Sequence, residues 1–324
     1  MKNILVTGSA GFIGSRTCEK LADYGYKVTG IDNVNDYYDV RLKEHRLKHL
    51  AKKYIEFRQI DIENYLELKK LFEEKKFDAV INLAARAGVR ASIENPDIYF
   101  STNVQGTLNL LKLCVEHKIN KFVLASTSSL YSGEPIPFSE KYPVNEPISP
   151  YAASKKAAEV LSYTYHYLYG VDVTVVRYFT VYGPAGRPDM SPLRFIHSIV
   201  EGKPLKLYGD GNQSRDFTYI DDIAEGTIKA LAPLGYEIIN LGGGRSPVTI
   251  NDFIKSIEEK TNKKAVIEYF PFNKADMKET MADISKAHKL LGWQPITEID
   301  EGVTKSVEWY HENRELMKGI DYYD

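Results

Sequence analysis

The sequence has little cysteine, no excess of one charge and no long apolar run. Only Cys18 and Cys114 occur among 324 residues, far apart and each in an apolar segment that is predicted to be helical. Such a pair argues against a disulfide framework or a metal site and is typical of a reducing compartment. The net charge of -2 provides no general attraction to nucleic acid or to an anionic membrane, so we expect a small-molecule partner.

No apolar stretch approaches the length of a membrane-spanning helix, and the first residues enter a strand pattern without the apolar core of a secretory signal. We therefore expect a cytoplasmic protein with no membrane partner. A hydrophobic content of 43% over this length is enough for one large domain or two modest ones.

A glycine-rich turn follows the first predicted strand, residues 2–7, and precedes an amphipathic stretch that reaches about residue 24. In that strand–turn–helix context, glycines let the backbone approach a pyrophosphate at the start of the helix, where free N–H groups and the helix dipole favour anions. The glycine spacing of three and three differs from the two and three of the commonest dinucleotide-binding pattern. The predicted contacts are Gly8, Gly11, Phe12, Ile13 and Gly14.

The second predicted strand, residues 27–31, ends in Asp32 and Asn33. A carboxylate at this position accepts hydrogen bonds from the hydroxyls of an adenosine ribose and repels a phosphate on that ribose. We therefore expect NAD rather than NADP, although Arg41 and Arg46 lie close by in the sequence and would favour the phosphate. Both arginines belong to a charged stretch, residues 35–53, that is predicted to lead into an exposed helix.

The third and fourth predicted strands, residues 55–60 and 79–83, also end in residues that suit a ligand. Asp61 and Ile62 provide a carboxylate for an adenine amino group and an apolar side chain for its flat face. Further predicted cofactor contacts are Leu83, Ala84, Ala85 and, in a helix expected over residues 99–117, Asn103.

Arg86 and Arg90 follow the fourth predicted strand, at the carboxyl end where open α/β sheets bind ligands. Two arginines at this place suit an anionic substrate. A surface salt bridge would also explain them.

Tyr151 and Lys155 are four residues apart in a segment with helix-forming alanines, so their side chains are predicted to lie on one helical face. A phenol has a pKa of roughly 10 and needs a nearby positive charge before the phenolate is populated at neutral pH. The lysine supplies that charge, which makes the pair a candidate acid/base, although an isolated pair of this kind also occurs in ordinary helices. A cluster of hydroxyls at residues 126–129 follows the fifth predicted strand and contains Thr127, the expected partner.

The alternation of strands and helices predicts an α/β fold with a Rossmann-type doubly wound parallel sheet. Beyond residue 178 the alternation weakens and the composition becomes loop-like. We therefore predict an NAD-binding Rossmann domain over residues 1–180, which also receives about 216–241. A smaller α/β substrate domain is predicted over 181–215 and 242–324.

Taken in order, these motifs resemble those of an extended short-chain dehydrogenase/reductase, over nearly the whole chain. Within that family the chain most resembles nucleotide-sugar epimerases, and the glucuronate 4-epimerase group in particular, through Asn35-Asp-Tyr-Tyr38, Ala87-Gly-Val-Arg90 and Tyr182 to Met190. The motifs shared with the wider family are Thr7 to Gly14, Asp32, Asp61-Ile62, Leu83 to Ala85, the hydroxyl cluster, Tyr151 with Lys155, Arg177-Tyr-Phe, and Arg215-Asp-Phe-Thr-Tyr.

The resemblance implies a tightly bound NAD⁺ and 4-epimerisation of a UDP-sugar by transient oxidation at C4. Tyr151 would be the base, Lys155 would hold the nicotinamide ribose and lower the tyrosine pKa, and Thr127 would hydrogen-bond the sugar O4. Hydride would leave C4 and return to the other face of the resulting ketone, so NAD would be regenerated within the site.

The resemblance also assigns the substrate contacts. Arg215 would bind the diphosphate, Tyr208 would stack near the uracil, and Asp276 would bind the nucleotide ribose. Relatives often carry an arginine where this chain has Asn273, so the diphosphate contact is expected to be shared with Lys274. The complete predicted set is Arg86, Arg90, Ser128, Ser129, Thr180, Arg187, Tyr208, Arg215 and Asp276.

The two residues after Thr127 decide between reaction types. Related dehydratases and decarboxylases place an acidic residue within these two positions, whereas this chain has Ser128 and Ser129. Plain epimerisation is therefore favoured, with hydroxyls of these serines and of Thr180, together with the Arg187 guanidinium, around a sugar carboxylate.

A UDP-hexuronate, UDP-glucuronate converted to UDP-galacturonate, is the substrate that this pattern favours. UDP-glucose or UDP-N-acetylglucosamine is the next candidate substrate. A UDP-glucuronate decarboxylase and a non-catalytic NAD-binding regulator are also compatible with the fold, although they fit the motifs less well.

Relatives of this kind are usually homodimers joined through two helices, here residues 99–117 and 154–169, so we expect a homodimer. The tyrosines of the second segment fit a buried face, which core packing would also explain.

Overall fold

The centre of the fold is a seven-stranded parallel sheet with the strand order β11-β6-β5-β4-β1-β2-β3. The computed structural model describes residues 2–272 and 276–322. The predicted doubly wound sheet is confirmed, and the predicted bounds of its first four strands differ from the observed ones by one residue at most. The strands are β1 Asn3–Thr7, β2 Lys27–Asp32, β3 Glu56–Gln59, β4 Ala79–Asn82, β5 Lys121–Thr127, β6 Asp172–Tyr178 and β11 Tyr236–Leu241.

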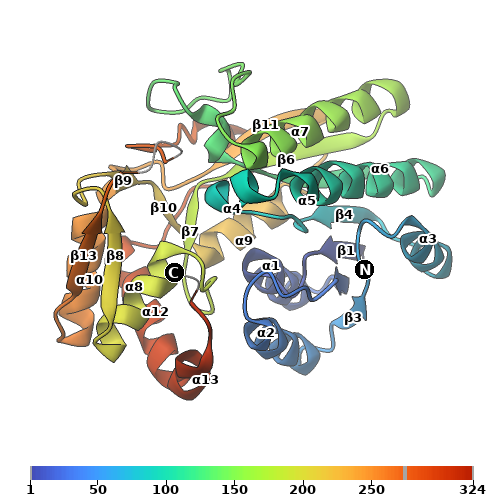
Figure 1. Cartoon of the computed structure of the whole chain (residues 1–324). Helices are drawn as coiled ribbons and strands as arrows, with labels where there is room; N and C mark the ends of the chain where they lie inside the picture. The colour runs from blue at the N-terminus through green and yellow to red at the C-terminus, as the bar shows by residue number, and fades with distance from the viewer. Residues whose placement is uncertain (1, 273–275, 323–324) are drawn as a thin grey trace.

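Helices cover both faces of this sheet (Figure 1). On one face, α1 Phe12–Asp23, α2 Val40–Lys52 and α9 Ile220–Lys229 share an apolar core with the strands. The short helix α11 Ser285–Leu291 adds Ala287 and Leu291 to the same core.

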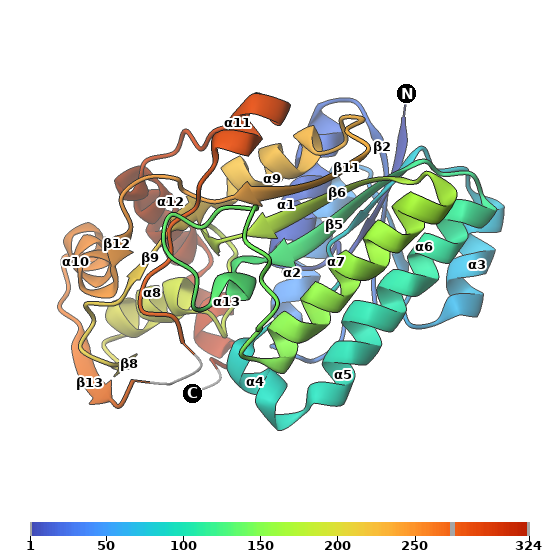
Figure 2. The same ribbon diagram turned by 90° about the horizontal axis from the view of Figure 1, so that it is seen from above.

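The opposite face is covered by α3 Tyr65–Glu74, α6 Thr107–Glu116 and α7 Pro150–Tyr169, which lie side by side in Figure 2. Because both faces are covered, β4, β5 and β6 are buried along their whole length. Their sequences are therefore largely apolar runs and do not alternate between polar and apolar residues.

The helix expected over residues 99–117 is interrupted in its middle. It consists of α5 Pro96–Phe100, the π-helix η1 Ser101–Gly106, and α6. A Cβ on Gly106 would lie 2.5 Å from Cδ1 of Ile62, so the glycine lets this turn approach the segment that follows β3. Single π-helical turns of this kind often occur at functional sites.

The charged stretch at residues 35–53 departs from its prediction. It does contain a helix, α2, but Leu42, Lys43, Arg46 and Leu50 are buried. The predicted exposed helix is therefore wrong on one face, because two of its cations point inward to partners at the edge of the sheet. Those partners belong to the candidate site described below.

The remaining elements form a smaller lobe beside the carboxyl edge of the sheet (Figure 1). Its apolar core contains side chains from each of the lobe helices given below, and β8 and β13 form a parallel pair at its edge. The predicted division into two domains stays a prediction. The lobe contains α8 Ser191–Glu201, β8 Pro204–Tyr208, α10 Ile250–Thr261, β13 Val266–Phe270, α12 Ile299–Glu312 and α13 Arg314–Gly319.

Short strand pairs join the lobe to the sheet. β7 Thr180–Tyr182 follows β6 and pairs with β10 Phe217–Tyr219, from which α9 returns to the sheet. β9 Ser214–Arg215 pairs with β12 Val248–Thr249. The chain therefore crosses between sheet and lobe several times near the carboxyl ends of the strands, which places residues of both parts around one edge.

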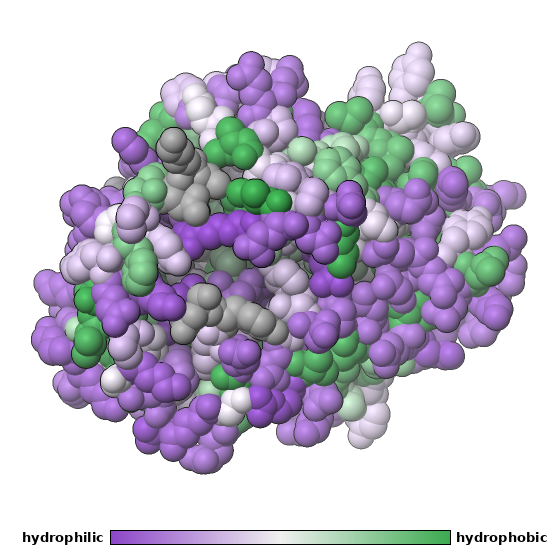
Figure 3. Space-filling view, viewed as in Figure 1, coloured by the Kyte–Doolittle hydropathy of each residue, from purple (hydrophilic) through white to green (hydrophobic). Residues whose placement is uncertain are grey.

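Figure 3 shows the molecular surface in the view of Figure 1. This surface is largely hydrophilic, and an apolar patch lies over α7. Tyr163, Tyr167, Leu168 and Tyr169 of that helix expose between 51% and 75% of their surface. Core packing within one chain therefore does not explain them.

Candidate functional site

Tyr151 and Lys155 lie in the first turns of α7. The helix begins with Pro150 and is capped by the side chain of Ser149, which accepts a hydrogen bond from the backbone N–H of Ala152 (3.2 Å). The cap and the proline fix the start of the helix, and the four-residue spacing places both side chains on the face that packs against β5.

The Lys155 ammonium group is buried, with 5% of the residue exposed, and donates a hydrogen bond to the carbonyl oxygen of Ala125 (2.9 Å). Burial lowers the pKa of Lys155 to about 8, because water that would stabilise the charge is excluded, and the Glu159 carboxylate opposes this shift only in part. Glu159 is itself held by Arg177 through two hydrogen bonds of 2.9 and 2.7 Å, and by the Ser126 hydroxyl (2.6 Å).

The pKa of Tyr151 is raised, and burial is the largest cause. The Thr127 hydroxyl and the charge of Arg187 oppose the rise, whereas the neighbouring phenol of Tyr37 adds to it. Lys155 is not among the groups that lower it. The expectation that this lysine lowers the tyrosine pKa stays a prediction for the site with its cofactor, and in the protein chain alone the ammonium group donates to the Ala125 carbonyl.

The hydroxyl cluster lies at the tip of β5, as predicted. Thr127 ends the strand, and Ser128 and Ser129 begin the 3-10 helix η2 Ser128–Tyr131. Oγ1 of Thr127 accepts a hydrogen bond from the backbone N–H of Ser129 and contacts its hydroxyl, both at 3.1 Å. The two hydroxyls therefore lie together at the edge of the sheet, and Thr127 also reaches Tyr151.

The turn between β1 and α1 fits a dinucleotide. Gly8 has a φ of +68°, and a Cβ there would lie 2.7 Å from the backbone nitrogen of Ala84. A Cβ on Gly14 would lie 2.0 Å from the carbonyl oxygen of Gly8, so only glycine lets the helix pack this closely on the turn. No side chain caps α1 at Gly11, which leaves the first N–H groups of the helix for an anion. The predicted contacts Phe12 and Ile13 lie in this first turn.

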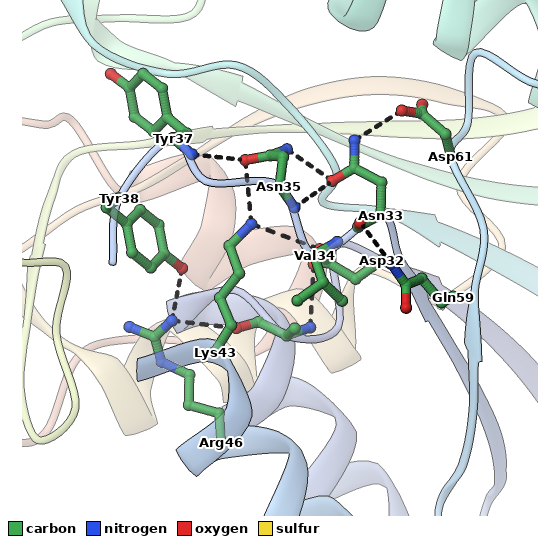
Figure 4. A network of polar contacts seen from close by, with 11 residues as sticks. Asp32, Asn33, Val34, Asn35, Tyr37, Tyr38, Lys43, Arg46, Gln59 and Asp61 are labelled. Carbon is green, nitrogen blue, oxygen red and sulfur yellow. Dashed lines mark hydrogen bonds and ion pairs between the residues drawn. The ribbon is translucent and has the colours of Figure 1, made fainter. Parts of the chain in front are cut away.

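The Asp32 carboxylate lies at the tip of β2, beside this turn (Figure 4). Its two oxygens accept hydrogen bonds from the backbone N–H groups of Ala10 (3.1 Å) and Val34 (2.8 Å), and Nζ of Lys43 lies 3.7 Å away. Sequence reasoning did not find Lys43, because its neighbours suggest a solvated helix. A backbone-anchored carboxylate here fits ribose hydroxyls and favours NAD over NADP.

Arg41 and Arg46, which would favour a ribose phosphate, are engaged elsewhere. Arg41 pairs with Asp39 and donates to the carbonyl oxygen of Gly319. Arg46 donates to the hydroxyl of Tyr38 (2.6 Å) and to carbonyl oxygens of the segment around residue 185.

The remaining predicted cofactor contacts gather at neighbouring strand tips. Nδ2 of Asn33 donates to Oδ2 of Asp61 (2.7 Å), which joins the ends of β2 and β3. Asn103, in the π-helix, accepts from the backbone N–H of Arg86 (2.9 Å) and donates to Oγ of Ser154 (2.9 Å). It therefore connects the loop after β4 with the helix of the candidate base. The loop after β4 begins with Leu83, Ala84 and Ala85, and Ile62 packs under the π-helix.

Four predicted substrate residues meet between the sheet and the lobe. Arg90, from α4 Val89–Glu94, donates to Oδ2 of Asp276 (2.6 Å), and its guanidinium lies 4.0 Å from the ring centre of Tyr208. Burial lowers the pKa of Arg215, and the charge of Asp276 opposes this while that of Arg90 adds to it. Two arginines, a carboxylate and an aromatic ring suit a nucleoside diphosphate. Asn273 and Lys274 lie outside the described residues.

A second cationic cluster lies nearer to Tyr151. Arg187 donates from Nε to Oδ1 of Asp189 (3.0 Å), and its guanidinium lies 5.5 Å from the ring centre of Tyr37. Arg86 lies 5.7 Å from the same ring, and its buried Nε has no hydrogen-bond partner in the described part of the chain. An orphaned buried donor fits an anionic ligand. Thr180, the remaining predicted contact, begins β7 at the same edge.

Sequence reasoning missed Tyr37 and Asp189 as members of this cluster. Tyr37 belongs to the Asn35-Asp-Tyr-Tyr38 motif, which indicated the family but no contact. Asp189 follows Arg187 by two residues, a spacing that predicts a local ion pair only once the loop is known to fold back on itself.

The described residues, 2–272 and 276–322, contain no group of three or more His, Cys, Asp or Glu side chains that could hold a metal ion. None of the helices in that part of the chain is long and apolar enough to cross a membrane. Both cysteines are free and buried.

Replacing Lys155 by methionine should stabilise the cofactor-free protein at pH 7 by about 1–3 kcal/mol, because a buried charge is removed. The folded-state pKa, about 8, lies below the unfolded value of roughly 10.4. The wild-type protein therefore bears the full penalty below pH 8 and progressively less above it. Urea unfolding should show a large advantage of Lys155→Met at pH 7 and a smaller one at pH 9.5.

The exposed Lys112 serves as the control, since Lys112→Met should change stability little and equally at both pH values. An advantage of Lys155→Met that is the same at pH 7 and pH 9.5 would show that burial of the charge is not its cause.

Comparison with known proteins agrees with this geometry. The profile of the NAD dependent epimerase/dehydratase family matches residues 4–242. The chain is 60% identical to UDP-glucuronate 4-epimerase of Thermodesulfobacterium geofontis over 98% of both chains. It is 40% identical to UDP-glucuronate 4-epimerase 1 of Arabidopsis thaliana, over 95% of this chain and 76% of that one.

Solved structures give the same result. The UDP-glucuronic acid 4-epimerase of Bacillus cereus in complex with UDP-glucuronic acid and NAD is 38% identical, with a TM-score of 0.89 over 96% of this chain and 99% of that one. The UDP-glucose 4-epimerase of Thermotoga maritima with UDP-glucose is 31% identical, with a TM-score of 0.87 and the same coverage. The resemblance drawn from the motifs is confirmed, and the chain belongs to the NAD dependent epimerase/dehydratase family.

Proposed function

We propose that the protein is an NAD-dependent isomerase that converts UDP-glucuronate to UDP-galacturonate. The observation that carries the proposal is the cationic cluster beside Tyr151, in which the partly buried Arg187 and the orphaned Nε of Arg86 both lie near the ring of Tyr37. A base with a hydroxyl partner beside a cationic pocket suits a sugar that carries a carboxylate near the carbon that reacts. The 60% identity to a protein named UDP-glucuronate 4-epimerase supports the same substrate.

The chain's own residues hold the proton and the substrate. Tyr151 takes the O4 proton at its phenolic oxygen, and the Thr127 hydroxyl orients O4 toward it. Lys155, anchored on Ala125, holds the ribose next to the base. When bound, NAD would supply the acceptor and the donor for the hydride at C4. The positive charge that lowers the pKa of Tyr151 then comes from the whole site with NAD bound, and not from one residue.

The nucleotide is held at the junction of sheet and lobe. Arg215 and Arg90 bind the diphosphate, Tyr208 stacks near the base, and Asp276 binds the ribose. In the protein chain alone Arg90 and Asp276 pair with each other across this junction. The diphosphate therefore competes with Asp276 for Arg90, so binding of the nucleotide frees the Asp276 carboxylate for the ribose hydroxyls.

The residues at the tip of β5 favour epimerisation over decarboxylation. Ser128 and Ser129 occupy the two positions after Thr127, and neither can do the proton work of an acid. The same hydroxyls, with Thr180 and Arg187, surround the sugar carboxylate. UDP-glucose lacks that group, so it would make no charge-assisted hydrogen bond with the part of the Arg187 guanidinium that Asp189 does not occupy, and it is the weaker candidate.

The protein as purified, incubated with UDP-glucuronate and without added NAD, is expected to form UDP-galacturonate. Separation of the nucleotide sugars and NMR identification of each product measure this. Conversion of UDP-glucose in a parallel reaction is expected to be at least about tenfold slower, as a lost charge-assisted hydrogen bond predicts. A predominant UDP-xylose product, or faster turnover of UDP-glucose, would contradict the proposal.

Arg187 is expected to prevent loss of CO₂ from the substrate. Oxidation at C4 makes a β-keto acid, which decarboxylates when the bond to the carboxylate stands perpendicular to the ketone plane. The electrons of that bond then pass into the enol of the ketone. We propose that Arg187 and the hydroxyls keep this bond away from the perpendicular.

Replacement of Arg187 by alanine should therefore raise the ratio of pentose product to UDP-galacturonate by about tenfold, the effect of one charge-assisted hydrogen bond. Product analysis of UDP-glucuronate reactions measures this ratio. The exposed Arg58, which pairs only with surface carboxylates in the described structure, provides the control Arg58→Ala. An unchanged ratio in Arg187→Ala would contradict this role.

We also propose a homodimer in the cytoplasm. The apolar patch on α7 is a surface that a second copy would cover, and Phe100 of α5, a helix that packs against α7, is also 44% exposed. Two buried free thiols fit a reducing compartment.

Sedimentation equilibrium should give about twice the 36.8 kDa of one chain. The double replacement Tyr167→Asp with Leu168→Asp should halve that mass, because charges would face each other across the interface. The matched control is Tyr24→Asp on the other face of the sheet, which should leave the mass unchanged. A wild-type mass of one chain would contradict the dimer.

A further inference from the structure

The loop after β2 reaches from the ribose site to the cationic cluster, and Tyr37 on this loop has no part in the reaction described above. Asn35 forms the centre of the loop (Figure 4). Its Oδ1 accepts hydrogen bonds from the backbone N–H of Tyr37 (3.1 Å) and from Nζ of Lys43 (3.2 Å). The same Nζ lies 3.7 Å from Oδ1 of Asp32. The backbone of Tyr37 is therefore fixed from the carboxylate that would hold the adenosine ribose.

The side chain of Tyr37 is fixed at its other end as well. Its hydroxyl donates a hydrogen bond to the carbonyl oxygen of Ala87. A Cβ on Gly88 would lie 2.4 Å from that hydroxyl oxygen, and Gly88 has a φ of +121°, so the ring approaches the loop after β4 only because residue 88 is glycine. The ring is thus held between two segments that both belong to the edge of the sheet.

Between these two anchors the ring lies against both arginines of the cluster. The guanidinium carbons of Arg187 and Arg86 are 5.5 and 5.7 Å from its centre, within the range of a cation–π interaction. Nε and Nη2 of Arg187 donate to Asp189, so Nη1 is the nitrogen that this ion pair leaves for a ligand. Asp189 therefore holds one edge of the guanidinium, and the ring of Tyr37 lies beside it.

We infer that Tyr37 is a positioning residue for sugar selectivity, which holds the guanidinium of Arg187 in the orientation that binds the carboxylate of a UDP-hexuronate. The inference rests on the proposed function, since it requires a substrate with that carboxylate. Asn35 and Lys43 connect the loop of Tyr37 to Asp32. The orientation of the Arg187 guanidinium therefore depends on this loop. The cofactor site at Asp32 and the arginine that binds the sugar carboxylate are therefore parts of one hydrogen-bonded unit.

The test compares binding of two nucleotide sugars that differ at the carboxylate. Dissociation constants of UDP-glucuronate and UDP-glucose are measured by calorimetry on the protein with its bound cofactor, in a Tyr151→Phe background that stops turnover. Tyr37→Leu, which removes the aromatic face, should weaken UDP-glucuronate about five- to thirtyfold and UDP-glucose less than about twofold. Tyr37→Phe keeps the aromatic face and should retain most of the selectivity.

A second variant, Asn35→Ala, loosens the loop without touching the ring and should cause the same selective loss to a smaller degree. The control is Tyr65→Leu, since the hydroxyl of Tyr65 bonds Glu116 on the far side of the sheet. Equal weakening of both sugars by Tyr37→Leu, or no weakening, would overturn the inference. If the protein with Tyr37 intact binds UDP-glucuronate no more tightly than UDP-glucose, the proposed function fails, and that result is obtained before Tyr37 is changed.

Discussion

The burial of the Lys155 ammonium group against the carbonyl oxygen of Ala125 is the interaction on which the site depends. The charge is costly to bury, and the fold offsets the cost with a hydrogen bond at the tip of β5 and with the carboxylate of Glu159 one helical turn away. Glu159 in turn requires Arg177 on β6, because a buried carboxylate without a cation would be strongly destabilising. Lys155 and its partners thereby tie helix α7 to two central strands.

The second requirement of the site is that backbone segments approach one another closely. The glycine turn after β1 touches the loop after β4, and α1 packs directly on that turn. Both approaches are possible only without side chains at Gly8 and Gly14, which explains the three-and-three spacing by packing as well as by phosphate binding. With the strand tips drawn together in this way, the predicted cofactor residues from β2, β3 and β4 and the proposed base on α7 share one edge.

Much of this site could be predicted from the sequence, since parallel strands end at the same edge and motifs at strand ends must meet there. The residues that the sequence did not reveal are those whose partners are distant in the chain. Lys43 and Arg46 have the sequence context of a solvated helix, and their burial depends on Asp32 and on the loop near residue 185. The proposed role of Tyr37 depends on the fold, which places the guanidinium of Arg187 5.5 Å from the centre of its ring.

The sequence also suggested an electrostatic pair, and the effect of Lys155 on the tyrosine pKa stays a prediction. Four-residue spacing places Tyr151 and Lys155 on one face, but it cannot show where the ammonium group points. In the folded chain that group is committed to a strand carbonyl, and burial raises the pKa of the tyrosine. Thr127 and Arg187, far from Tyr151 in the sequence, are the residues of the chain that counteract burial.

The most direct test of this mechanism follows the hydrogen at C4. UDP-glucuronate that carries deuterium at C4 is incubated in ordinary water with the protein as purified, without added NAD, and the product is examined by NMR. We predict UDP-galacturonate that retains deuterium at C4, because the hydride leaves and returns within one closed site. Loss of deuterium to water would indicate proton abstraction at carbon and would contradict the assignment of Tyr151 as the base that acts on O4.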